Sequence, residues 1–137
     1  MNWYNVSLST PVKPTPVAII LLVILLCSCA REAEPHHGVW KGDAFFVEMK
    51  YEFSVKKFDA STNTLNGLQV GGGSGTYVAE NGQITMYYDR KYVYDNRENR
   101  GSWESDDKEI VVAFYVDGDR MQFDYVGTSQ SIELERQ

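Results

Sequence analysis

A strict alternation of apolar and polar side chains constrains the fold of this 137-residue chain more than any other feature. Between residues 47 and 55 every odd position is apolar and every even position is polar, in the order Val47, Met49, Tyr51, Phe53 and Val55. A period of two places successive side chains on opposite faces of a β-strand. The segment is therefore predicted to be a strand with one buried face and one face in water.

Turn signals recur about every ten residues after this strand, as in an antiparallel all-β domain. Asn81-Gly82 separates two strand-like runs and is the strongest short hairpin signal, because both residues tolerate a positive φ. Asp117-Gly118-Asp119 and Gly127–Gln130 separate later runs in the same way, without calcium-loop spacing. No convincing amphipathic helix is present. The sequence predicts about eight strands in an up-and-down meander that closes into a small barrel, with a two-layer sandwich as the alternative.

Two further stretches in this part of the chain have turn-like composition. Asp59–Asn63 is predicted to form a turn between two short strands. Gly71–Gly75 lacks the Gly-Lys-Ser/Thr ending of a phosphate-binding loop, and no helix follows it. It is predicted to be a flexible connection or a sharp bend in a strand.

An apolar run from Val17 to Leu26 precedes the β-rich part. It is too short for a membrane span, which needs about 20 residues, and has the length of the apolar region of a signal peptide. Leu26-Cys27-Ser28-Cys29 resembles the lipobox of bacterial lipoproteins, which has an aliphatic residue, a small residue and then an obligatory cysteine. The resemblance implies a lipoprotein signal with Cys29 as the lipid attachment site.

This interpretation divides the chain into residues 1–28, a cleaved signal; 29–37, a lipidated tether; and 38–137, the folded domain. Acyl chains on Cys29 would hold the exported domain on a membrane, and Ala30 after it resembles outer-membrane lipoproteins of the cell envelope. Neither a disulfide nor a free thiol would remain in the mature chain. The chain carries 13 Lys and Arg against 19 Asp and Glu, a net charge of −6, which argues against a nucleic-acid partner.

Histidine and cysteine chemistry is not expected in the folded domain. His36 and His37 are the only two histidines and fall in the predicted tether. A catalytic zinc site needs three protein ligands and a structural one four, so no metal or other cofactor is predicted. A nucleophile on the domain would have no histidine base, so a non-enzymatic protein is predicted, with a hydrolase as a minor alternative.

Short motifs in residues 38–137 resemble the lipocalin-like domains of bacterial lipoproteins. They are Gly38-x-Trp40, Gly75–Val78 before the Asn-Gly hairpin, the Val116–Met121 turn and the closing Ile132–Arg136 strand. The resemblance implies a ligand-binding barrel in which Trp40 plugs the closed end beneath Arg136. The domain is shorter than a full lipocalin and no C-terminal helix follows its last strand.

Taken together, these features predict a non-enzymatic barrel module that binds a small apolar or amphipathic ligand. The predicted ligand-binding side chains share the inward face of the strands: Val47, Met49, Tyr51, Phe53, Tyr77, Met86, Phe114, Phe123 and Tyr125, with Ile84 also inward. The alternative is an interaction or inhibitor module with a filled core and an envelope protein as partner. Its surface would be the aromatic and cationic stretch Tyr87–Trp103 and the second apolar face of Ile110–Val116.

Overall fold

The computed structural model describes residues 34–137, and this part of the chain contains nine β-strands and no helix. The strands are β1 (Gly38–Ala44), β2 (Val47–Phe53), β3 (Lys57–Thr64), β4 (Gln69–Glu80), β5 (Gln83–Asp95), β6 (Arg100–Ser105), β7 (Glu109–Asp117), β8 (Arg120–Tyr125) and β9 (Ser131–Arg136). The predicted signal and Cys29 lie outside the described residues. Among residues 34–137 no helix has the length and apolar character to cross a membrane.

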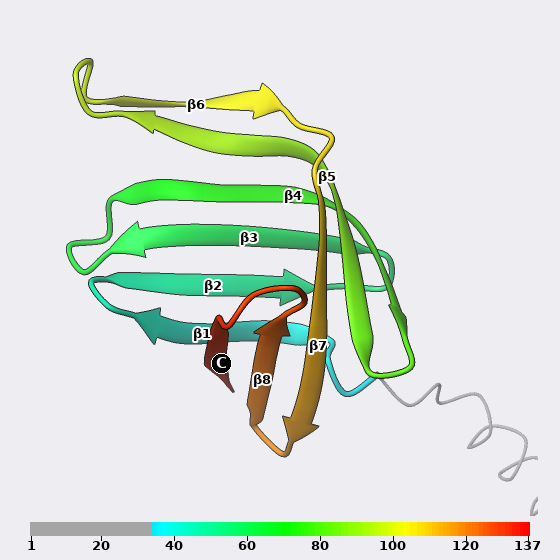
Figure 1. The fold of residues 1–137 in the computed structure, drawn as a ribbon. Coiled ribbons are helices and arrows are strands. Elements are labelled where there is room, and N and C mark those ends of the chain that lie inside the picture. The colour runs from blue at the N-terminus through cyan, green and yellow to red at the C-terminus, as the bar shows by residue number, and fades with distance from the viewer. Residues whose placement is uncertain (1–33) are drawn as a thin grey trace, which may run out of the picture. The chain divides into compact units, whose positions relative to one another are not determined.

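Eight of the nine strands close into an antiparallel barrel (Figure 1). Successive strands pair from β1 to β5 and from β7 to β9. β5 also pairs with β7, and β9 returns to β1, where Arg136 lies opposite Trp40. The predicted all-β class and the barrel are confirmed, and the sandwich alternative is not formed.

The ninth strand, β6, lies outside the ring and pairs only with the second half of β5. β5 is long enough, at 13 residues, to serve two partners. Its first half pairs with β7, and Arg90–Asp95 pairs with β6. A register shift against β4 between Ser74 and Gly75 separates the two halves of β5. Asp89 is the extra residue of a bulge. The alternation of inward and outward side chains along β5 therefore shifts by one position at Asp89.

The hairpin turns follow the predicted chemistry. Asn81 and Gly82 connect β4 to β5 with φ values of 54° and 74°, and Gly118 connects β7 to β8 at 59°. Ile110–Val116 lies in β7, which is paired on both sides, so its backbone is not an exposed sheet edge.

The turn predicted at Asp59–Asn63 is wrong, because these residues lie within β3 and pair with both β2 and β4. Ala60 lies opposite Tyr51 and packs against the core. Aspartate and asparagine have low strand propensity, but pairing on both sides overrides it.

Gly71–Gly75 also lies within a strand, β4, so it is not a flexible connection. The bulge beside Gly75 matches the predicted strand bend. A Cβ at Gly73 would overlap the ring of Tyr88, and one at Gly75 would overlap the carbonyl of Tyr87. These glycines let β5 and its inward ring lie close to β4.

One contiguous core fills the barrel toward the end at which the described chain enters. Its buried members are Trp40, Tyr51, Phe53, Phe58, Tyr77, Ile84, Met86, Val112, Met121, Phe123, Ile132 and Leu134. Aromatic rings meet edge to face there, with centroids of Phe53 and Tyr77 5.1 Å apart. The barrel is therefore filled with side chains at this end.

Candidate functional site

The solid end is closed by the residues that precede β1. Sequence analysis assigned Glu34–His37 to a tether, and the structure places them against the barrel. The guanidinium of Arg136 lies 4.4 Å from the ring centroid of Trp40. It also donates hydrogen bonds to the carbonyl oxygens of Pro35, at 2.7 Å, and His37, at 3.1 Å. Arg136 thus joins the entering chain to the first and last strands.

His36 is buried beneath this closure. Its ring meets the rings of Phe53, Tyr77 and Phe114 edge to face. Nε2 of His36 is hydrogen-bonded to the hydroxyl of Tyr77 at 3.1 Å, and the indole of Trp40 donates to the His36 carbonyl at 2.8 Å. Burial lowers the pKa of His36, as does His37, whereas Glu34 acts in the opposite direction. The ring therefore favours its neutral form.

The opposite end of the barrel holds a cavity of about 430 Å³. Its wall combines apolar side chains, tyrosines and charged groups: Met49, Tyr51, Ala60, Thr62, Gly72, Tyr88, Lys91, Tyr92, Asp106, Lys108, Ile110 and Tyr125. Most of these come from the inward faces of β2, β3, β5, β7 and β8, and Asp106 and Lys108 come from the β6–β7 connection. The volume falls in the range of about 300–1,000 Å³ that is typical of small-molecule sites.

Tyrosine side chains contribute hydroxyl groups to the wall of this cavity. The hydroxyls of Tyr51 and Tyr125 are hydrogen-bonded to each other at 2.7 Å. Burial, and to a smaller extent the neighbouring Tyr125, raises the pKa of Tyr51 well above its ordinary value. Burial, with smaller contributions from Tyr125 and Asp106, raises the pKa of Tyr88 to about 12. These two phenols stay protonated at neutral pH and can donate to a polar group of a ligand.

The charged groups at the cavity favour an anion. Lys91 is partly buried and Lys108 is exposed, and within residues 34–137 neither ammonium has an ion-pair partner. Asp106 is the one carboxylate on the wall, so the cationic groups exceed it by one. Lys91 points inward because the bulge in β5 places it opposite Gly73.

Exposed apolar side chains lie at the turns of the same end. Phe45 and Phe46 form the β1–β2 turn and are 100% and 80% exposed. Leu65, in the β3–β4 turn, lies beside them, because Val47 pairs with Thr64. The cavity therefore has a partly apolar rim.

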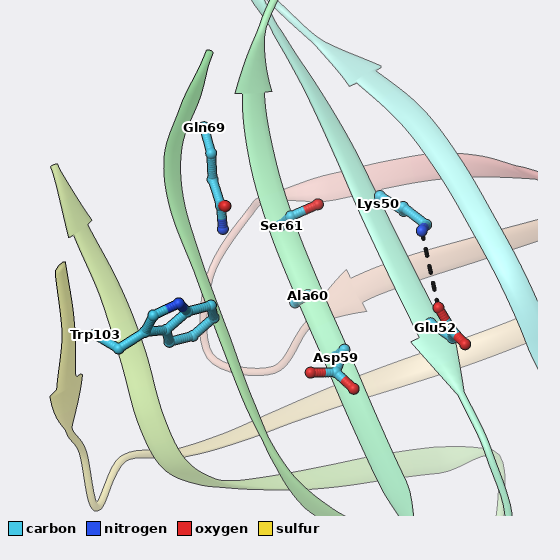
Figure 2. A pocket seen from close by; sticks show the side chains of 7 residues that line it. All are labelled: Lys50, Glu52, Asp59, Ala60, Ser61, Gln69 and Trp103. Atoms are coloured by element: carbon cyan, nitrogen blue, oxygen red, sulfur yellow. Dashed lines mark ion pairs between the residues drawn. The ribbon is translucent and has the colours of Figure 1, made fainter. Parts of the chain in front are cut away.

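A second, smaller hollow of about 130 Å³ lies on the outer face of β2, β3 and β4 (Figure 2). Figure 2 shows Trp103 of β6 on one side and the Lys50–Glu52 ion pair on the other. The indole of Trp103 is 45% exposed and lies beneath the guanidinium of Arg90, 4.7 Å from it. This hollow belongs to the outer aromatic surface of the alternative hypothesis.

The predicted ligand-binding residues fall into three groups. Met49, Tyr51 and Tyr125 line the open-end cavity. Phe53, Tyr77, Met86 and Phe123 are buried in the solid core with Ile84, and Phe114 packs beside His36. Val47 lies at the rim, next to the β1–β2 turn. The predicted residues thus lie on the inward face of the strands, but the cavity occupies only the part of that face near the open end.

Sequence reasoning missed Tyr88, Lys91 and Lys108 as wall residues. The stretch Tyr87–Trp103 was recognised for its aromatic and cationic composition, but its inward and outward members were not separated. The bulge in β5 makes Tyr88 and Lys91 both inward although three positions separate them, which no simple alternation predicts.

Comparisons with known proteins add no family to this description. No family model matches the chain, and neither curated proteins nor solved structures gave a match.

Proposed function

We propose that this barrel binds a small amphipathic molecule with an acidic head group in its open-end cavity. The observation that carries the proposal is the 430 Å³ cavity, whose wall combines four tyrosines with two ammonium groups. Met49 and Ile110 offer apolar contact to the body of the ligand. Lys91 and Lys108 offer charge to its head group, because charge-assisted hydrogen bonds are stronger than neutral ones.

The closure of the other end supports a one-ended site. The guanidinium of Arg136 lies over the indole ring of Trp40, which supports the closed end that the resemblance to lipocalin-like domains implies. We infer from this that the domain is lipocalin-like, and the ligand-binding role proposed for it is non-enzymatic. A ligand enters and leaves only through the end bordered by Phe45 and Phe46.

Anchoring by lipid is part of the same proposal. The motif Leu26–Cys29 supports export and acylation of Cys29, with the domain held at the cell envelope, on the outer membrane. Residues 34–37 join the barrel at its solid end, opposite the cavity.

The test is mass spectrometry of an organic extract of the full protein, purified in detergent from its native envelope. We expect a stoichiometric amphipathic acid. In the variant Thr62→Trp the added ring fills the cavity, so the bound molecule should disappear while the circular dichroism spectrum is retained. A clean extract from the folded wild-type protein would contradict the proposal.

Charge substitutions locate the head group. Lys91→Gln should weaken binding about tenfold or more, because a hydrogen bond to a charged group contributes about 1.5–3 kcal/mol. Lys50→Gln is the matched control, because Lys50 lies on the outer face. Equal effects of the two substitutions would place the ligand outside the barrel.

A second function is favoured by the outer hollow beside Trp103. Exposed tryptophan and arginine are the side chains most often found at the centres of protein interfaces, and Trp103 and Arg90 stack here. In this alternative an envelope protein binds the outer face of β2–β4. Cross-linking in the native envelope that is lost in Trp103→Ala and kept in Thr62→Trp would support it over the ligand-binding function.

A further inference from the structure

A buried nitrogen without a partner marks the closed end of the barrel. Nε2 of His37 is inaccessible to solvent and has no hydrogen-bond partner among the described residues. Buried polar atoms in proteins are almost always hydrogen-bonded, so an exception indicates that a partner is missing. Imidazole nitrogens that lack a hydrogen-bond partner are well suited to binding a metal ion.

Two further ligand groups lie beside this nitrogen. Glu34, His36 and His37 each offer one ligand atom, and the three atoms lie within 4.8 Å of one another. The Glu34 carboxylate is 3.4 Å from Nε2 of His36. Ligand atoms on a tetrahedral zinc ion are about 3.4 Å apart, given bonds of about 2.1 Å. Nε2 of His36 is hydrogen-bonded to Tyr77 in this structure, so zinc binding through this nitrogen would replace that hydrogen bond. The three ligand atoms would also draw together from their present separations of up to 4.8 Å.

The surroundings hold these groups in place. His36 is wedged among three aromatic rings, and its carbonyl accepts from Trp40. The carbonyl of His37 accepts from Arg136. Such support of the ligand residues by packing and outer hydrogen bonds is what a metal site requires. Glu34 is exposed, so its carboxylate is accessible to an ion in solvent.

We propose that Glu34, His36 and His37 bind one zinc ion at the closed end of the barrel. Two imidazoles and a carboxylate match the three protein ligands of open zinc sites, with water completing the coordination. The ion would link the chain that enters the barrel to its closure. This site is separate from the open-end cavity, so the proposal stands independently of the proposed ligand.

The test is calorimetric titration of zinc chloride into the full chain in detergent, after treatment with a chelator. Cys27→Ser and Cys29→Ser are present throughout, so that thiols do not bind the metal. We expect one equivalent of zinc to bind. Cobalt, bound at the same site, should show the visible absorption bands of a tetrahedral ion.

Ligand variants decide the assignment. His37→Ala should weaken zinc binding by more than about 100-fold, since loss of an outer hydrogen-bond partner alone costs about 10–100-fold. Glu34→Gln keeps an oxygen but removes the charge of a direct ligand, so it should weaken binding by at least about tenfold. Glu98→Gln is the matched control, because Glu98 is an exposed carboxylate on the β5–β6 turn. No binding by the starting protein, or equal affinity in His37→Ala, would overturn the proposal.

Discussion

The guanidinium carbon of Arg136 lies 4.4 Å from the ring centroid of Trp40, and the two residues also pair across β1 and β9. The same side chain donates to the carbonyls of Pro35 and His37. One arginine therefore closes the barrel seam, covers the core tryptophan and holds the entering chain. No other side chain in residues 34–137 combines these roles.

Replacing Arg136 should destabilise the barrel more than replacing an arginine in an exposed ion pair. We expect Arg136→Ala to lower the free energy of unfolding by about 2–3 kcal/mol, through loss of a cation–π contact and hydrogen bonds. Arg136→Lys should retain only part of this stabilisation, because lysine cannot make the planar, forked contacts of a guanidinium group. Urea unfolding followed by tryptophan fluorescence measures the effect.

Arg120→Ala is the control for that experiment. Arg120 pairs with Glu133 on the surface, at 3.4 Å, and both side chains are more than half exposed. Its loss should change stability by less than about 1 kcal/mol. Equal losses in Arg120→Ala and Arg136→Ala would mean that the closure contributes no special stability.

The barrel could be predicted from the sequence because alternation and turn residues are local signals. Val47–Phe53 alternates, and Asn81-Gly82 needs only its own backbone conformation. Asp59–Asn63 could not be recognised as strand, since pairing with β2 and β4 overrides its composition. The closed-end position of His36 depends on contacts with Tyr77 and Phe114, far along the chain. Such contacts leave no periodic pattern in the sequence.

The raised pKa of Tyr88 should make the barrel sensitive to alkali. Tyr88 has a pKa of about 12 in the folded protein, against an ordinary value near 10, so folding favours its neutral form. Its contribution to stability is complete below pH 10 and is lost as the pH rises toward 12. Tyr88→Phe should reduce this loss. Urea midpoints measured between pH 9 and 12 test it, and an unchanged profile in the variant would contradict the assignment.

Glycine at position 73 is required by the ring of Tyr88. A methyl group at Gly73 would overlap that ring inside the cavity. We expect Gly73→Ala to cost about 1–3 kcal/mol, as overpacking does, and to push the ring farther into the cavity. Gly71→Ala is a close control, since its Cβ would meet Thr62 at an ordinary 3.5 Å. Unfolding midpoints that move equally in both variants would show that strand entropy, and not the ring, sets the requirement.

Phe45 has a backbone conformation that its side chain disfavours. Its φ is 57°, in the left-handed region, and the side chain is fully exposed at the rim of the cavity. A left-handed conformation costs a residue with a Cβ about 1–2 kcal/mol, and asparagine tolerates it better. Phe45→Asn should therefore raise the free energy of unfolding by about 1 kcal/mol, as measured in urea. Phe46→Asn is the control, because Phe46 lacks a positive φ. A gain in stability in both variants would attribute the effect to lost surface hydrophobicity. A gain confined to Phe45→Asn, with weaker ligand uptake, would show that this rim retains an apolar side chain at a cost in folding stability.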